Sequence, residues 1–375
     1  MDKLKVILSG GGTGGHIYPA VAVAEALKRR LGDGVELLFV GAEGKMEMEK
    51  VPALGYRIEG LPVVGLQRRL TLRNLQVPFK VAESLRKARR VIREFGADVV
   101  VGFGGYASAP VLWSAQRMGI PTLIQEQNSY AGVTNKILAS RAKRICVAYE
   151  GMERFFPKDR IVMTGNPLRG RLLEQHDPAV LKAEGLTYFG LKADKPIVLV
   201  VGGSLGTRTL NNMMKANVDR ITSEGKVQVI WQTGKFYERE MTEFMQSRSS
   251  EGIWRRAFID RMDLAYAVAD VVVGRSGAGT VSELCLVGKP AIFVPSPNVA
   301  EDHQTKNAMA LVRKDAALLV PDSEAVTALF PVVDQLLADP ARMQRMAANI
   351  KALGIADSAD RIVDELLAVV QAQKK

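Results

Sequence analysis

The chain has 375 residues, of which 47% are hydrophobic, and a formal net charge of +11 at pH 7. This length predicts two domains of about 150–200 residues, and the composition is that of a globular protein, which excludes a largely disordered chain. The two cysteines, Cys146 and Cys285, are too few for a disulfide framework or a cysteine-ligated zinc site. No apolar run reaches the ~20 residues of a membrane-spanning helix, and the first residues lack a signal peptide's apolar core, so we expect a cytoplasmic protein.

Short apolar runs in the first half predict the buried strands of a parallel sheet, because each run is apolar throughout rather than alternating. Apolar residues at helical spacing over 20–31 follow the first run. Strands that alternate with helices are typical of a doubly wound α/β domain. The expected strands are 5–9, 37–41, 98–102, 122–125 and 144–148.

The same pattern restarts in the second half of the chain. The expected strands there are 196–203, 227–231, 271–274 and 291–295. Glycine and proline at 165–167 break regular structure between the two halves. We therefore expect an α/β protein with two Rossmann-like domains, 1–166 and 167–357, and a C-terminal helix over about 358–375 that packs back onto the first domain.

Two glycine-rich turns, each directly after an expected strand, are the most informative motifs of the chain. They are Gly-Gly-Gly-Thr-Gly-Gly at 10–15 and Gly-Gly-Ser-Leu-Gly at 202–206. Glycine lets a backbone approach a phosphate, and the helix that follows presents its N–H groups to the anion. A nicotinamide dinucleotide site is an alternative, but Glu36 precedes the second strand, where the ribose-binding carboxylate of such a site would not lie. A tight turn without a ligand is the remaining alternative.

Two candidate general bases lie near expected strand ends. His16, one of three histidines, follows the first glycine turn, and an imidazole at a helix N-terminus can take a proton from an attacking hydroxyl. Glu126 lies in the polar run Gln-Glu-Gln-Asn at 125–128, which would suit a sugar or peptide, and the glycines of 102–105 would open the same sheet edge. A histidine that only caps a helix and a plain polar loop are the alternatives.

The second half carries two further polar loops. The segment 275–283 leads from a strand into a helix and makes a second anion cradle, in which Glu283 could accept hydrogen bonds from a ribose. The segment 301–308 could close on a sugar with its amide groups. A helix cap is the alternative for each. The sequence contains no Asp-x-Asp, the motif that often holds Mg²⁺ on a nucleotide diphosphate, so we expect a metal-independent reaction.

The positive charge is concentrated in one tenth of the chain. Between Arg57 and Arg93 there are ten basic residues and two acidic ones. Such a cluster indicates a nucleic acid or an anionic lipid surface as partner, with a solvated helix face as the alternative. Phe79 is the only aromatic residue in this stretch, so the stacking surfaces of a nucleic-acid-binding module are missing and no nucleic acid is expected.

The motifs taken together resemble the MurG family, the N-acetylglucosaminyltransferases of bacterial peptidoglycan synthesis. The resemblance runs in order from about residue 4 to 310. It rests on Gly-Gly-Thr-Gly-Gly-His at 11–16, Gly-Gly-Tyr at 104–106, Glu-Gln-Asn at 126–128, Gly-Asn-Pro at 165–167, Gly-Gly-Ser at 202–204, Arg-Ser-Gly-Ala at 275–278, and Gln304 with Asn307-Ala308. Gln125 and His303 depart from the pattern of some relatives.

The resemblance implies a GT-B fold, with two Rossmann-like domains facing a central cleft, and an inverting, metal-independent transfer without a cofactor. N-acetylglucosamine (GlcNAc) would pass from UDP-GlcNAc to the C4 hydroxyl of N-acetylmuramic acid (MurNAc) in undecaprenyl-diphosphate-linked MurNAc-pentapeptide (lipid I), which makes lipid II. The enzyme would then be peripheral on the cytoplasmic face of the bacterial inner membrane, with other proteins of cell-wall synthesis and division as further partners. A nicotinamide-dependent oxidoreductase, a nucleic-acid-binding module and a sugar-nucleotide epimerase are the competing hypotheses.

The resemblance also implies residue roles. His16 is the preferred base and Glu126 the reserve. Ser204 and Arg169 would meet the diphosphate, the backbone of Ile259 would read uracil, and Gln304 would hold GlcNAc. The segment of Ala278, Gly279, Thr280, Val281, Ser282 and Glu283 would hold diphosphate and ribose. The donor sugar or the acceptor would contact Thr13, Gly14, Gly15, Tyr106 and Asn128. Insertion into an anionic leaflet would involve Leu72, Leu75 and Phe79.

Overall fold

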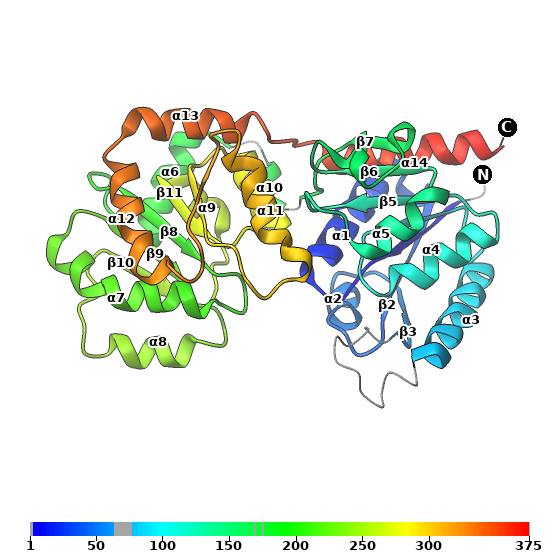
Figure 1. Ribbon diagram of the computed structural model, residues 1–375, viewed down its shortest axis with the longest axis horizontal. Coiled ribbons are helices and arrows are strands. Elements are labelled where there is room, and N and C mark those ends of the chain that lie inside the picture. The colour runs from blue at the N-terminus through cyan, green and yellow to red at the C-terminus, as the bar shows by residue number, and fades with distance from the viewer. Residues whose placement is uncertain (1–2, 64–76, 169, 175, 375) are drawn as a thin grey trace. The chain divides into compact units, whose positions relative to one another are not determined.

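The computed structural model describes residues 3–63, 77–168, 170–174 and 176–374 (Figure 1), with no side-chain description at 77, 78, 171, 300 and 374. It divides into two compact units, Met1–Arg169 with Ile355–Lys375, and Gly170–Gly354. The expected domain boundary at 166–167 lies next to this division. Among the described residues, none of the helices combines the length and apolar character that crossing a membrane requires.

The first unit is built on a parallel sheet. Its strand order, in the part of the chain that the structure describes, is β3-β2-β1-β4-β5-β6-β7. The strands are β1 (Leu4–Ser9), β2 (Val35–Ala42), β3 (Ile58–Leu61), β4 (Val99–Gly102), β5 (Thr122–Glu126), β6 (Arg144–Val147) and β7 (Ile161–Met163). The helices are α1 (Gly14–Leu31), α2 (Glu47–Ala53), α3 (Val77–Phe95), α4 (Ser108–Arg117), α5 (Val133–Leu138) and α14 (Ser358–Lys374).

Helices cover both faces of this sheet, which explains why its central strands are apolar throughout. Successive side chains of a strand point to opposite faces. Val6 and Leu8 of β1 therefore pack in the core with α1 and α14, while Ile7 packs in a second core with α3 and α4. The C-terminal helix α14 lies against α1 (Figure 1).

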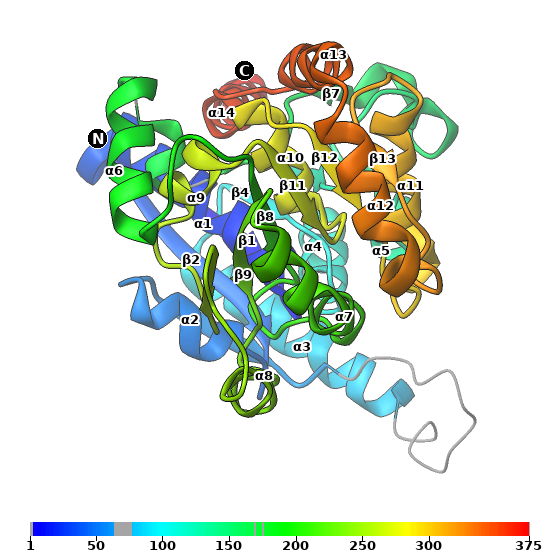
Figure 2. The same cartoon turned by 90° about the vertical axis from the view of Figure 1, so that its left-hand side faces the viewer.

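The second unit repeats this architecture with a sheet in the order β10-β9-β8-β11-β12-β13, counted over the described residues. Its strands are β8 (Ile197–Val201), β9 (Gln228–Gln232), β10 (Ile253–Arg256), β11 (Val271–Gly274), β12 (Ala291–Phe293) and β13 (Leu318–Leu319). Its helices are α6 (Pro178–Phe189), α7 (Arg208–Glu224), α8 (Glu238–Met245), α9 (Met262–Val268), α10 (Ala278–Val287), α11 (His303–Val312), α12 (Ala325–Leu337) and α13 (Pro340–Lys351). Val198 and Val200 pack with α7 and α12, which lie side by side (Figure 2).

In both sheets the strand order reverses beside the first strand of the unit. The neighbours at this point are β1 and β4 in the first sheet, and β8 and β11 in the second. Ligands of open α/β sheets bind at such a switch point, beyond the carboxyl ends of the strands. The two glycine turns follow β1 and β8, so the fold places each of them at a switch point.

Candidate active site

The turn after β1 orients the ring of His16. Nδ1 of His16 lies 2.9 Å from the carbonyl oxygen of Gly11 and 3.3 Å from Oγ1 of Thr13. A carbonyl oxygen can only accept, so Nδ1 carries the proton, and Nε2 is the basic nitrogen of the neutral ring. Gly104, at φ +90°, lies beside this nitrogen: a Cβ there would be 3.2 Å from Nε2. The structure thus brings the 104–106 motif next to the candidate base.

A residue that the sequence analysis did not select, Glu47, supports this turn. Its side chain is completely buried. Oε2 accepts from the N–H of Gly12 at 3.0 Å, and Oε1 accepts from the N–H of Ala42 at 3.0 Å. Glu47 lies in a charged stretch with Glu43 and Glu49, and nothing in that stretch distinguishes it from its neighbours. Only the fold brings it under Gly12.

The second base candidate, Glu126, is engaged in holding its own loop. It is 2% exposed at the end of β5. Oε1 accepts from the backbone N–H of Asn128 at 3.1 Å, and Oε2 accepts from the N–H of Gly132 at 3.0 Å and from Nδ2 of Asn135 at 2.8 Å. Both carboxylate oxygens therefore accept hydrogen bonds from the segment 128–135. This geometry favours a structural role for Glu126 and leaves His16 as the stronger base candidate.

The idea that all of 125–128 faces a sugar needs correction. Gln125 and Gln127 are buried along with Glu126. Nε2 of Gln127 donates to the carbonyl oxygen of Phe103 at 2.8 Å, and Nε2 of Gln125 donates to Oδ1 of Asn166 at 2.9 Å. These amides satisfy buried backbone and side-chain groups, so of the four residues only Asn128, which is half-buried, lies at the surface of the unit.

The remaining first-unit candidates are accessible. Thr13 and Gly15 are exposed, Gly14 is half-buried, and the Tyr106 side chain is 60% exposed. Thr13 and Tyr106 lie in the loops after β1 and β4, the pair of strands at the switch point, and Gly14 and Gly15 begin α1. The base candidates and the predicted substrate contacts of this unit are therefore gathered at the carboxyl ends of its strands.

The glycine turn after β8 is held by neutral groups. Gly206 lies against the backbone of 233–234, where a Cβ would be 2.3 Å from the carbonyl oxygen of Thr233. Gln232 is buried; its Nε2 donates to the carbonyl oxygen of Gly203, and its Oε1 accepts from the N–H of Ile259, each at 3.0 Å. Gln232 thus joins the turn that carries the exposed Ser204 to the Ile259 backbone. The N–H of Ile259 is therefore already bonded within the unit.

The helix α10 begins at Ala278 after Gly277, which has no side chain to cap the helix. Glu283 lies in its second turn and is half-buried. The hydroxyl of Tyr266 donates to Oε2 of Glu283 at 2.9 Å. Burial raises the pKa of Glu283 above its usual value, and the hydrogen bond from Tyr266 partly offsets this effect. Burial, with the nearby Glu283 carboxylate, raises the pKa of Tyr266 well above its usual value. Tyr266, on α9, was missed because no motif surrounds it.

Gln304 is oriented by its neighbours. Its Oε1 accepts from the N–H of Ser296 at 2.9 Å, and its backbone carbonyl accepts from Oγ of Ser276 at 2.8 Å. The side-chain oxygen is therefore used internally, and the amide NH₂ is the donor that can be presented to a sugar. These contacts join the ends of β11 and β12 to the start of α11.

Some predicted residues lie outside the described residues, namely Arg169, Leu72 and Leu75. Phe79, at the start of α3, is described and is 78% exposed. Val81 is also exposed, at 50%, because the buried face of α3 begins further along the helix. Exposed cations follow on the same helix: Arg86, Arg89, Arg90 and Arg93.

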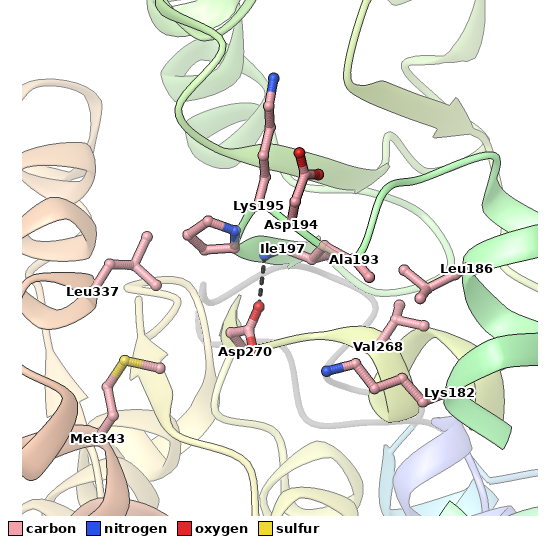
Figure 3. A pocket seen from close by; sticks show the side chains of 11 residues that line it. Lys182, Leu186, Ala193, Asp194, Lys195, Ile197, Val268, Asp270, Leu337 and Met343 are labelled. Carbon is pink, nitrogen blue, oxygen red and sulfur yellow. Dashed lines mark hydrogen bonds between the residues drawn. The ribbon is translucent and has the colours of Figure 1, made fainter. Parts of the chain in front are cut away.

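A pocket of about 280 Å³ lies at the amino ends of the strands of the second sheet, away from the glycine turn (Figure 3). It is lined by Lys182, Asp194, Lys195, Leu337 and Met343, among others. Asp270 accepts there from the backbone N–H of Ile197 at 2.8 Å, which ties the amino ends of β8 and β11 together. None of the sequence-predicted residues lines this pocket. Among the described residues, no group of three or more histidine, cysteine, aspartate or glutamate side chains is placed to hold a metal ion.

Two family models match the chain, one in each half. The glycosyltransferase family 28 N-terminal domain matches residues 6–147, and the family 28 C-terminal domain matches residues 197–362. The UDP-N-acetylglucosamine--N-acetylmuramyl-(pentapeptide) pyrophosphoryl-undecaprenol N-acetylglucosamine transferase of Parabacteroides distasonis is 53% identical over 99% of both chains. The enzyme of the same name from Flavobacterium psychrophilum is 50% identical over 100% of both chains.

Solved structures give the same result. The crystal structure of Acinetobacter baumannii MurG superposes with a TM-score of 0.77 at 28% identity, over 97% of this chain and 99% of that one. The UDP-GlcNAc 2-epimerase of Neisseria meningitidis is 14% identical with a TM-score of 0.66 over 97% of this chain and 100% of that one, which shows a shared fold alone. From these relatives and from both domain matches, the chain belongs to the MurG family of glycosyltransferases.

Proposed function

We propose that this protein transfers GlcNAc from UDP-GlcNAc to the C4 hydroxyl of MurNAc in lipid I, with inversion and without a metal ion, and so makes lipid II. The names of the relatives at 50–53% identity support the substrates. The observation that carries the chemistry is the orientation of His16. Its Nδ1 is committed to Gly11, so Nε2 can accept a proton at the switch point of the first sheet.

His16 acts as the general base of this proposed reaction. As the C4 oxygen forms a bond to C1 of GlcNAc, Nε2 takes the hydroxyl proton. The bond between C1 and the diphosphate oxygen breaks on the opposite side, and UDP leaves with the electron pair. One displacement of this kind inverts the configuration at C1. The imidazolium formed is stabilised by its Nδ1–H hydrogen bond to the Gly11 carbonyl.

The second unit holds the donor in this proposal. The diphosphate is met by Ser204 and by the N–H groups at the start of α10, which have no competing side-chain cap. Glu283, which binds the Tyr266 hydroxyl, accepts hydrogen bonds from the ribose hydroxyls. The side-chain NH₂ of Gln304 donates a hydrogen bond to the sugar. The helix N-terminus and side-chain donors thus stabilise the charge of the diphosphate, as Mg²⁺ does in metal-dependent enzymes.

The first unit also binds the membrane in this proposal. The exposed Phe79 and Val81 begin a helix whose later turns expose four arginines. Apolar side chains next to cations suit an anionic leaflet, and the lipid-linked acceptor requires a peripheral position on the cytoplasmic face of the membrane.

The variant His16→Ala tests the base. We expect kcat to fall by about 10²–10⁴-fold, because the base acts in the transition state, while UDP-GlcNAc affinity changes by no more than about twofold. His176→Ala is the matched histidine control and should keep full activity. Unchanged turnover of His16→Ala would refute the role of His16. Loss of transfer on chelation with EDTA, restored by Mg²⁺, would refute metal independence.

A double variant, Phe79→Ser with Val81→Ser, tests membrane binding. Sedimentation with anionic vesicles should fall by about tenfold, since two apolar side chains no longer enter the leaflet, while transfer to a soluble acceptor is retained. Phe236→Ser is the control, because Phe236 is 74% exposed in the second unit. Equal vesicle binding by the double variant and the unaltered protein would remove this part of the proposal.

A further inference from the structure

One peptide group connects a buried carboxylate to the candidate base. The N–H of Gly12 and the carbonyl of Gly11 belong to the same peptide unit. The N–H donates to Oε2 of Glu47 at 3.0 Å, and the carbonyl accepts from Nδ1 of His16 at 2.9 Å. Glu47 and His16 therefore bind the two opposite ends of a single planar group.

Three glycines make room for this arrangement. A Cβ on Gly11 would lie 2.0 Å from Oε1 of Glu47, and a Cβ on Gly41 would lie 2.5 Å from Cγ of Glu47. A Cβ on Gly105 would lie 2.4 Å from the Gly11 carbonyl oxygen that His16 binds. Side chains at these positions would displace the carboxylate or the peptide, so this contact requires glycine at all three positions.

The carboxylate is unusual in its surroundings. Glu47 is 0% exposed, and no described residue forms a salt bridge with it. A fully buried glutamate is rare because its charge must leave water. Here two backbone N–H groups, those of Gly12 and Ala42, solvate it. The negative charge is thus kept inside the unit and directed at the Gly11–Gly12 peptide.

We propose that Glu47 is a positioning residue for His16, acting through the Gly11–Gly12 peptide to hold the ring in the tautomer whose Nε2 is basic. This inference rests on the proposed role of His16 as base. Hydrogen bonds in a chain polarise one another, so the carboxylate makes the Gly11 carbonyl a stronger acceptor for Nδ1–H. The same chain stabilises the positive charge that the ring acquires when Nε2 takes the proton. A carboxylate bound directly to a catalytic histidine has this effect in Ser-His-Asp triads, and here a peptide group stands between the two.

The variant Glu47→Gln tests the proposal with little change of shape. The glutamine amide can accept only at its oxygen, so its NH₂ must face the N–H of either Gly12 or Ala42. We expect kcat to fall by about 10–100-fold with the KM for the donor within about twofold, as for outer-shell partners of reactive groups. Glu49→Gln, on the exposed side of the same helix, is the matched control and should behave as the unaltered protein.

The decisive readout is the tautomer of His16, measured by ¹⁵N NMR on imidazole-labelled protein at a pH about two units above the ordinary histidine pKa of about 6.5. The chain has only three histidines, so His176 and His303 serve as internal references. In the unaltered protein the spectrum should show Nδ1 protonated. In Glu47→Gln the His16 signals should shift towards a mixture of tautomers, while the other two histidines are unchanged.

A second variant tests the same contact by moving the Glu47 carboxylate instead of removing its charge. Gly11→Ala keeps the charge of Glu47 but displaces its carboxylate, so it should change the His16 signals in the same direction. An unchanged Nδ1-protonated ring in folded Glu47→Gln would overturn the role of Glu47, whatever its activity. Retained turnover in His16→Ala would instead overturn the base itself, whatever the tautomer. The two failures are therefore distinguishable.

Discussion

The two glycine turns of this protein have similar sequences and switch-point positions but different supports. Beneath the turn after β1 lies a buried carboxylate, Glu47, which binds the Gly12 N–H. At the turn after β8 the corresponding support is a buried amide, Gln232, which binds the Gly203 carbonyl. One turn is built against a negative charge and the other against a neutral group.

The difference between the two supports matches the charge that each turn would face. In the proposed reaction the first turn carries a histidine that becomes positive, and a nearby carboxylate stabilises that charge. The second turn meets a diphosphate, which a carboxylate would repel. Two turns with similar glycine patterns can thus suit opposite charges, one a positive histidine and the other a diphosphate. The side chain that supports each turn makes the difference.

The strongest test of this comparison places a carboxylate under the second turn. Gln232→Glu should lower UDP-GlcNAc affinity by about 100-fold or more, because like charges close together cost several kcal/mol and the Gly203 carbonyl would also face an anion. Donor titration by calorimetry measures the effect. Gln232→Met removes the same hydrogen bonds without adding charge and should weaken binding much less. Equal losses in the two variants would show that charge is not what distinguishes the turns.

A second test compares how the turns are packed. The contact at Gly206 is with backbone, since a Cβ would lie 2.3 Å from the Thr233 carbonyl, whereas the contact at Gly11 is with the end of the Glu47 side chain. Backbone cannot move aside as a side chain can. Gly206→Ala should therefore lower the free energy of unfolding by about 2–4 kcal/mol, more than Gly11→Ala.

The control for this test is Gly203→Ala. Gly203 has φ +83° but nothing within 4 Å of an added Cβ, so the substitution introduces only backbone strain, at about 1 kcal/mol. Urea unfolding of the three variants gives the order. If Gly206→Ala were no less stable than Gly203→Ala, the close backbone contact would not matter to the second turn.

The sequence predicted the central strands of both sheets and missed the edges. Nine expected strands are confirmed, while β3, β7, β10 and β13 were not predicted. These four are the outermost strands of the two sheets. They are short and only partly buried, as Ile58–Leu61 and Leu318–Leu319 show, so they lack the continuous apolar run that marks a strand buried on both faces.

The same reasoning explains what could be predicted of the site. His16 and Glu283 follow glycine-rich turns, so the local sequence marks them. Glu47 is 35 residues from Gly12 along the chain, and Tyr266 is 17 residues from Glu283. The pairing of β1 with β2 brings Glu47 close to Gly12, and the packing of α9 brings Tyr266 close to Glu283. The local sequence around each residue gives no sign of these contacts.

The smallest expected effect concerns Glu283, the carboxylate that binds the ribose in the proposed donor site of the second unit. A tyrosine hydroxyl binds this carboxylate, and burial raises its pKa. Because the ionised form accepts the proposed ribose hydrogen bonds, donor affinity should fall as pH is lowered through this raised pKa. Tyr266 has its own pKa raised, so it remains a donor throughout.

Tyr266→Phe removes the hydrogen bond that lowers the pKa of Glu283. The carboxylate should then protonate at still higher pH, so the loss of donor affinity should begin earlier as pH falls, and the weakening at a given pH should be about 5–10-fold at most. Titration of UDP-GlcNAc across pH gives the two profiles, and Tyr188→Phe, on the exposed surface of α6, is the control. Superimposable profiles for Tyr266→Phe and the unaltered protein would mean that Glu283 does not need its tyrosine.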